Sequence, residues 1–126
     1  MIQRAAIYAR VDTSTQVDRR FSLPSQIESC KKFAEQKGFT VVGIYQDEIS
    51  GTKPIASRPG GRRLFRAINS GQIDAVVVYR VDRLSRDSMD FLKTFRDWLR
   101  ANIEIYALNM GQVKGELGTC IKTTFK

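Results

Sequence analysis

The chain of 126 residues contains no histidine, and its two cysteines, Cys30 and Cys120, are not spaced as metal ligands. These absences argue against a zinc site and against a cysteine–histidine nucleophile pair. They also remove the commonest general base, so any chemistry has to use Arg, Asp, Glu, Lys or hydroxyl groups. Cys30 falls on the apolar side of a predicted helix, and we expect it to be buried as a small hydrophobic side chain.

Long apolar runs are missing too. No stretch approaches the length that spans a membrane. The opening residues, Met1 to Arg4, do not resemble a signal peptide, so we expect a cytoplasmic protein without membrane contact. No Gly-x-Gly-x-x-Gly or Gly-Lys-Ser/Thr loop follows the first predicted strand, which disfavours a small-molecule phosphate binder of flavodoxin or Rossmann type.

Acidic residues are outnumbered, with 13 Asp and Glu against 21 Lys and Arg, a net charge of +8 and a pI near 9.9. This excess indicates a polyanionic partner, and nucleic acid above all, although a merely basic soluble domain has the same composition. The hydrophobic content of 42% and charged content of 27% are typical of a soluble globular protein, and the length suits one domain.

Four apolar runs predict strands, at residues 5–11, 39–45, 73–79 and 103–108, and the third is apolar enough for a central parallel strand. Three amphipathic segments predict helices. The first starts near Ser22 and ends at Gly38, the second follows Pro59 and ends at Gly71, and the third is capped by Asp87 or Ser88. The alternation predicts a three-layer α/β domain with a mostly parallel central sheet of about four to five strands flanked by helices.

The helical patterns also predict which side chains face the core. The inward residues are Leu23, Ile27, Cys30 and Ala34 in the first helix, Leu64, Phe65 and Ile68 in the second, and Phe91, Leu92, Phe95, Trp98 and Leu99 in the third. Residues 12–21 and 47–58 lack periodicity and are predicted to be loops. Residues 111–126 begin a helical pattern after Gly118.

Arginines gather after two of the predicted strands. The first strand ends in Arg10, followed by Val11 and Asp12, and the third is followed by a segment that contains Arg83 and Arg86. Because strand ends at one edge of an α/β sheet lie together, we expect these segments to meet. Planar, forked guanidinium groups suit a phosphate better than lysine does.

In order and spacing, these segments resemble the catalytic domain of the serine recombinases, the family of resolvases, invertases and large serine integrases. The matching pieces, which span residues 3 to about 120, are Tyr8-Ala9-Arg10-Val11, Gln16, Ser22-Leu23-Pro24-Ser25-Gln26, Asp47-Glu48-Ile49-Ser50-Gly51, Arg58-Pro59-Gly60 and Tyr79-Arg80-Val81-Asp82-Arg83-Leu84-Ser85-Arg86. Relatives cleave and rejoin DNA through a phosphoseryl ester within a synaptic tetramer, without a metal or nucleotide cofactor. The resemblance therefore implies double-stranded DNA with a specific recombination site as partner, a nucleoid location, and a homodimer or tetramer of the full-length protein.

The resemblance also implies roles for individual residues. Arg10, Arg83 and Arg86 would hold the scissile phosphate, Arg58 would join them from a loop, Gln16 and Gln26 would support the nucleophile loop, and Asp47 and Ser50 would line the neighbouring loop. Arg83 and Arg86 are expected to project from one side of a first helical turn. Alternatively, they pair with Asp82 or Asp87 in a solvated cap network. Arg62, Arg63 and Arg66 are candidate DNA-backbone contacts, or simply a solvated basic face.

One position departs from the family. The nucleophilic serine of the family follows Arg-Val directly, and here that residue is Asp12. A carboxylate about 4 Å from a phosphate is repelled by about 1 kcal/mol in bulk water and about 4 kcal/mol at an effective dielectric constant near 20. An acyl phosphate would moreover lose strands to water. We therefore expect Asp12 to pair with the arginines in place of a phosphate, which leaves the chain inactive.

The aspartate at position 12 is also compatible with Thr13 or Ser14 as a displaced nucleophile, and with a deliberate serine-to-aspartate substitution. The preferred hypothesis is the catalytic domain of a site-specific DNA recombinase. The alternative is a non-catalytic DNA-binding or recombinase-assembly module that keeps the arginine phosphate pocket. In the family a long helix with dimer contacts begins near the end of this sequence and leads to a DNA-binding domain. We therefore expect residues 1–126 to be a truncated single domain without that C-terminal part.

Overall fold

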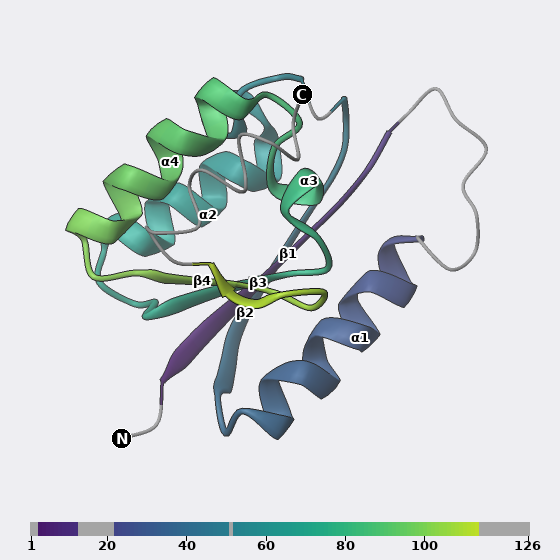
Figure 1. The fold of residues 1–126 in the computed structure, drawn as a ribbon, viewed down its shortest axis with the longest axis vertical. Helices are drawn as coiled ribbons and strands as arrows, with labels where there is room; N and C mark the ends of the chain where they lie inside the picture. The colour runs from purple at the N-terminus through teal and green to yellow at the C-terminus, as the bar shows by residue number, and fades with distance from the viewer. Residues whose placement is uncertain (1–2, 13–21, 51, 114–126) are drawn as a thin grey trace.

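The computed structural model describes residues 3–12, 22–50 and 52–113, and Figure 1 draws the remainder as a thin grey trace. Of the residues named in the sequence analysis, Thr13, Ser14, Gln16, Gly51 and Cys120 lie outside the described ones. The helix predicted after Gly118 lies outside them as well.

A five-stranded sheet forms the centre of the fold, in the order β2-β1-β3-β4-β5. The strands are β1 (Arg4–Val11), β2 (Thr40–Glu48), β3 (Ala75–Val78), β4 (Glu104–Ala107) and β5 (Gly111–Val113). Pairing is parallel from β2 through β4, and β5 runs antiparallel to β4. The predicted mostly parallel sheet is confirmed, as is the central position of the third strand.

Helices cover both faces of the sheet (Figure 1). One face is covered by α1 (Leu23–Gln36), and the other by α2 (Pro59–Asn69) and α4 (Ser88–Arg100). Two short elements, η2 (Ile55–Ser57) and α3 (Val81–Leu84), precede α2 and α4 respectively. The three-layer arrangement predicted from the alternating pattern is therefore confirmed.

Strand β1 contributes to two hydrophobic cores, one on each face of the sheet, because its successive side chains point to opposite faces. Ala6 and Tyr8 pack on the side of α2 and α4, whereas Ala5 and Ile7 pack on the side of α1. Seven of the eight residues of β1 are buried, which matches a strand between two helical layers. Cys30 is buried in the core on the side of α1, as predicted, and its burial raises the pKa of the thiol to about 12.

The helix boundaries follow ordinary capping chemistry. The Ser22 hydroxyl accepts a hydrogen bond from the amide of Ser25 at the start of α1, and Gly38, with φ of 77°, follows its end. The Asp87 carboxylate accepts hydrogen bonds from the amides of Met89 and Asp90, so Asp87 caps α4 as predicted. None of the helices in the described part of the chain combines the length and apolar character needed to cross a membrane.

Several predicted details were wrong. Strand β2 runs on to Glu48 rather than ending at Tyr45, because Asp47 finds buried hydrogen-bond donors and stays in the sheet. Leu99 is 51% exposed rather than facing the core, and Thr94 takes a buried place on α4 instead. The short strand β5 was not predicted, since three residues are too few to show an alternating pattern.

Candidate functional site

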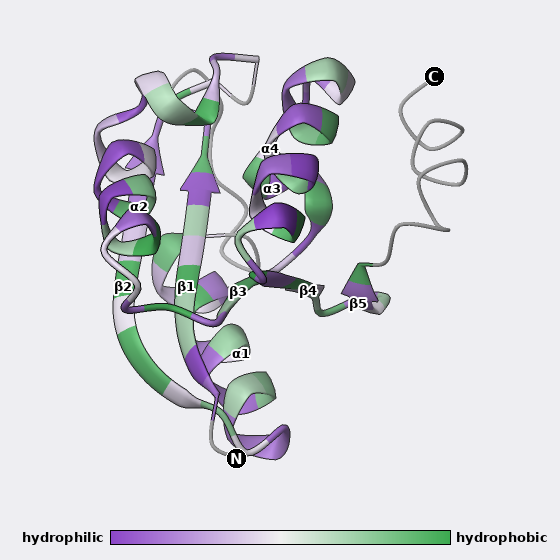
Figure 2. Ribbon diagram, turned by 90° about the vertical axis from the view of Figure 1, so that its left-hand side faces the viewer, coloured by the Kyte–Doolittle hydropathy of each residue, from purple (hydrophilic) through white to green (hydrophobic). Residues whose placement is uncertain are grey.

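The two arginine segments meet at the carboxyl ends of β1 and β3. The guanidinium of Arg10 donates from Nε to the carbonyl of Arg83 (3.1 Å) and from Nη2 to the carbonyl of Asp82 (2.9 Å). Figure 2 shows the change of polarity at this end, where the arrowhead of the largely apolar β1 is hydrophilic. The expected convergence of these two segments is thus present in the fold.

Arg10 is completely buried although it is charged. Its Nη1 donates to the carboxylate of Asp12 (2.7 Å) and to the carbonyl of Ile49 (3.0 Å), which adds two acceptors to the carbonyls already named. Burial lowers the pKa of Arg10, whereas Asp12 acts in the opposite direction. Because arginine remains protonated in proteins, this cage holds a fixed positive charge at the end of β1.

Asp12 joins the buried arginine to an exposed one. Its Oδ1 lies 2.7 Å from Nη1 of Arg10, and its Oδ2 lies 3.4 Å from Nη1 of Arg86. The side chain of Asp12 is 20% exposed and that of Arg86 is 54% exposed. The prediction that Asp12 pairs with the arginines is therefore confirmed. The alternative pairing of Arg86 with Asp87, both of them described residues, does not form, since Asp87 caps α4.

Arg83 and Arg86 do not share a helical turn, contrary to the prediction from their spacing. Helix α3 ends at Leu84, and Ser85 is extended, with φ of −155° and ψ of 140°. The Ser85 hydroxyl bonds to Asp90 and to the backbone of Asp87, which ties the extended residue to the start of α4. This break places Arg86 between two helices, from where it reaches Asp12.

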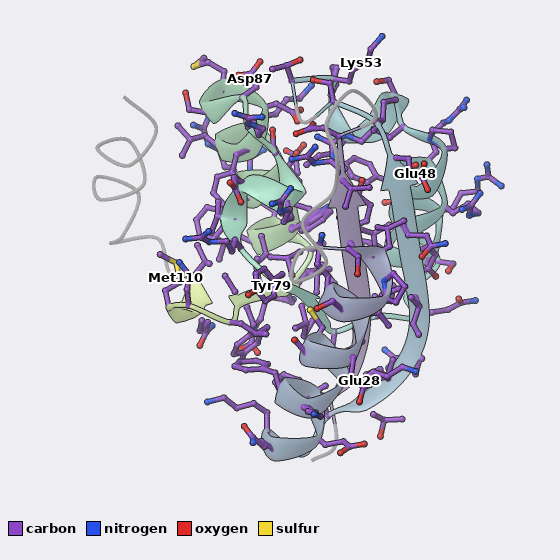
Figure 3. All side chains as sticks on the ribbon, turned by 90° about the vertical axis from the view of Figure 1, so that its right-hand side faces the viewer. Glu28, Glu48, Lys53, Tyr79, Asp87 and Met110 are labelled. Carbon is purple, nitrogen blue, oxygen red and sulfur yellow. The ribbon has the colours of Figure 1, made fainter. Side chains whose placement is uncertain are left out.

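Arg58 is also completely buried, in the bend between η2 and α2, where it is the N-cap residue of α2. It donates to the carbonyls of Lys53 (3.1 and 2.9 Å) and Leu84 (2.7 Å) and to the hydroxyl of Tyr8 (3.0 Å). Figure 3 shows Lys53 and Asp87 at the same end of the molecule. Arg58 thus connects the loop before η2 and the end of α3 to Tyr8 on β1.

Asp47 does not line a loop, as was expected, but is a buried acceptor on β2. Its carboxylate accepts hydrogen bonds from the hydroxyl of Tyr8 (2.7 Å) and from the amides of Gly60 (2.8 Å) and Gly61 (3.0 Å). An anion is favoured there because the amino end of α2 carries partial positive charge. Burial raises the pKa of Tyr8, so its hydroxyl stays protonated as a donor.

Tyr8 was not among the functional residues predicted from the sequence. The available signal was a phenol inside an otherwise apolar strand, because a buried tyrosine hydroxyl usually has a polar partner. Its hydroxyl joins Asp47 to Arg58, so it connects two residues that the sequence motifs had placed in the site separately.

The remaining candidates lie at different distances from the arginines. Gln26 is completely buried, and its side-chain amide bonds to the amide (3.3 Å) and carbonyl (3.0 Å) of Arg10, which fixes the end of β1 to α1. Ser50 bonds locally with Thr52 (2.8 Å). Arg62, Arg63 and Arg66 are exposed on α2, facing outward as predicted. Among the described residues, no group of three His, Cys, Asp or Glu side chains could hold a metal ion.

Comparison with known proteins finds resolvases and recombinases. Residues 5–123 match the family model "Resolvase, N terminal domain". The Transposon Tn2501 resolvase of Escherichia coli is 29% identical over 114 residues, which cover 89% of this chain and 53% of that protein. The chain thus spans about half the length of that relative.

Two solved structures are similar over most of the fold. The N-terminal catalytic domain of TP901-1 integrase has 34% identity and a TM-score of 0.82, covering 98% of this chain and 91% of that one. The C-terminal catalytic domain of ISC1926 TnpA, an IS607-like serine recombinase, has 30% identity and a TM-score of 0.71, covering 83% and 68%. This chain therefore belongs to the resolvase N-terminal domain family, the catalytic domain of the serine recombinases.

Proposed function

We propose that this chain is the catalytic domain of a site-specific DNA recombinase whose arginine cluster binds the scissile phosphodiester, and that Asp12 at the nucleophile position makes it inactive. One observation carries the proposal. The Asp12 carboxylate lies between Arg10 and Arg86, so the cluster already holds an anion at the end of β1. In the proposed substrate, a DNA phosphodiester would be the anion that takes the place of this carboxylate.

The arginines would divide the work according to their burial. Arg86 is exposed and Arg83 is partly exposed, so these two can reach a phosphate oxygen from solvent. Arg10 and Arg58 are completely buried and would supply a preorganised positive field, which is stronger where water is excluded. Gln26 would keep the end of β1, and with it position 12, in place through the backbone of Arg10.

Asp12 works against both binding and chemistry in this arrangement. Its carboxylate competes with the phosphate for Arg86. At a separation of about 4 Å the carboxylate also repels the phosphate by about 1 kcal/mol, even at the dielectric constant of water. A serine there would present a neutral hydroxyl to the phosphorus. Asp12→Asn should therefore strengthen binding of the isolated chain to a short duplex at low salt by about fivefold or more, the factor that about 1 kcal/mol gives.

Fluorescence anisotropy measures this change, and Glu28→Gln on the outside of α1 is the matched control because it removes the same charge at an exposed site. Equal affinities for Asp12→Asn and Glu28→Gln would show that Asp12 does not compete with DNA.

Cleavage is tested with Asp12→Ser in a chimera, where this chain replaces the catalytic domain of a resolvase with a known recombination site. On a nicked form of that site, Asp12→Ser should give a covalent protein–DNA adduct that survives denaturant. Asp12→Ala, which lacks the hydroxyl, and the unchanged chain should give none.

The alternative function is a non-catalytic DNA-binding or recombinase-assembly module that retains the phosphate pocket. The same ion pairs of Asp12 with Arg10 and Arg86 support it, because they fill the pocket with a carboxylate in place of the serine hydroxyl that the cleavage reaction needs. Under this alternative the Asp12→Ser chimera binds its site and forms no adduct.

A further inference from the structure

The outer surface formed by α2 and α4 carries six exposed cationic side chains. They are Arg62, Arg63 and Arg66 on α2, and Lys93, Arg96 and Arg100 on α4. We call this surface the α2–α4 basic face. The two helices cover the same face of the sheet (Figure 1), and the rings of Phe65 and Trp98 lie 5.7 Å apart between them. The six cations therefore lie on two helices that cover the same face of the sheet.

The charge of this face is poorly neutralised. Helix α2 contains no acidic residue. On α4 the carboxylate of Asp90 is engaged with the Ile55 amide and the Ser85 hydroxyl, which leaves Asp97 as the exposed acid of that helix. In the described part of the chain, no ion pair involves any of the six cations. Helix α1, on the opposite side, balances Lys31 and Lys32 with Glu28 and Glu35.

The dimensions suit a linear polyanion. At about 1.5 Å per residue, the two helices are about 16 and 20 Å long. Duplex DNA carries one negative charge per about 1.7 Å of its axis, so a duplex segment as long as α4 carries about a dozen phosphate charges. Contacts between arginine or lysine and phosphate position a protein without reading sequence.

The basic face is also continuous with the candidate site. Helix α2 begins directly after Arg58, and α4 begins directly after Arg86 and Asp87. Both helices therefore extend from the end of the molecule where the arginine cluster lies. This continuity favours DNA over another polyanion, because the proposed substrate is already held at that end.

We propose that the α2–α4 basic face binds the sugar–phosphate backbone of duplex DNA, independently of sequence, and extends the contact made at the arginine cluster. The proposal rests on the proposed function for the identity of the polyanion. It adds a second contact surface, in which α4 takes part together with the three arginines of α2.

The test compares three double variants of the chain by fluorescence anisotropy with two labelled duplexes of unrelated sequence, between 50 and 200 mM NaCl. They are R62Q/R66Q on α2, R96Q/R100Q on α4, and K31Q/K32Q on α1 as the control. Each removes two exposed positive charges, so overall charge changes equally. All six positions are exposed, and circular dichroism verifies that each variant is folded.

Each phosphate contact adds about 0.9 to the slope of log K against log salt. R62Q/R66Q and R96Q/R100Q should each lower that slope by up to about 1.8 with both duplexes, whereas K31Q/K32Q should leave it nearly unchanged. Equal slopes for all three variants would overturn the proposal. So would displacement of the DNA by poly-glutamate as readily as by unlabelled duplex, since the face would then accept any polyanion.

The result separates from the test of the proposed function. Asp12→Asn alters affinity at the arginine cluster whether or not the basic face binds DNA. If Asp12→Asn left the affinity for DNA unchanged, the result would count against phosphate binding at the arginine cluster alone. The salt dependence of the α2 and α4 variants does not depend on that result.

Discussion

At the scale of single residues, the end of β1 is held by buried charges with backbone partners. Arg10 and Arg58 direct most of their hydrogen bonds to carbonyl oxygens of loops and short helices, rather than to carboxylates. Each such bond gives a polar carbonyl group a charged partner, and unsatisfied buried polar groups are costly. The two arginines therefore shape the site as well as charge it.

Tyr8 connects these charges, and its hydroxyl can be removed alone. Tyr8→Phe deprives Asp47 of a donor and Arg58 of an acceptor. The free energy of unfolding should fall by about 1–3 kcal/mol, the usual cost of leaving buried polar groups unsatisfied. Urea denaturation measures the change.

Tyr45→Phe serves as the control, because Tyr45 is a partly buried residue of β2 whose hydroxyl makes no hydrogen bond with any described residue. If the two variants lost equal stability, the Tyr8 hydroxyl would have no special role in this network.

At the scale of elements, the amino end of α2 is pressed against β2 and η2. A Cβ added to Gly60 would overlap the carbonyl oxygen of Gln46, and one added to Gly61 would overlap the carbonyl oxygen of Ile55. Their amides both donate to Asp47, so the absence of side chains lets the helix end approach the carboxylate. This approach sets the position of Arg58, the residue before α2.

The sign of the stability change in Gly61→Ala should reveal this close packing. In an ordinary helix interior, replacing glycine by alanine stabilises by roughly 0.5–1 kcal/mol. Here the added methyl should instead destabilise the protein by about 1–3 kcal/mol, as overpacking does. Thermal denaturation provides the measurement, with Asn69→Ala at the exposed end of the same helix as a comparison expected within about 0.5 kcal/mol of the parent. A stabilised Gly61→Ala protein would contradict the close packing.

At the scale of the whole molecule, the buried thiol of Cys30 links stability to alkaline pH. Burial raises its pKa to about 12, against about 8.5 for an ordinary thiol. The folded state then keeps a proton that the unfolded state releases. Stability from this group is fully present below about pH 8.5, and it falls by up to about 1.4 kcal/mol per pH unit between those two pKa values.

Urea unfolding at pH 7.5 and pH 10 tests this linkage in a Cys120→Ser background. The parent should lose about 1–2 kcal/mol more on alkalinisation than Cys30→Ala, since only the parent carries the buried thiol. Parallel losses in the two proteins would mean that Cys30 opens to solvent without global unfolding.

The sequence by itself determined the layers of the fold, a cap of α4 at Asp87 or Ser88 and the outward face of α2, because each depends on periodicity or on neighbours in the chain. It also indicated that Arg10 and the segment around Arg83 meet, since parallel strands end at a common edge. Gln26, Arg58 and Asp12 could be named from motif position alone.

Only the tertiary structure decided what these groups do. In the structure Arg10 and Arg58 are buried among carbonyl groups, and Asp47 contacts the amino end of α2 instead of lining a loop. The extended residue Ser85 separates Arg83 from Arg86. Such outcomes depend on donors and acceptors supplied by segments distant in the chain, which no local pattern records. Local propensities set the elements, and long-range hydrogen bonding between them set the chemistry at their ends.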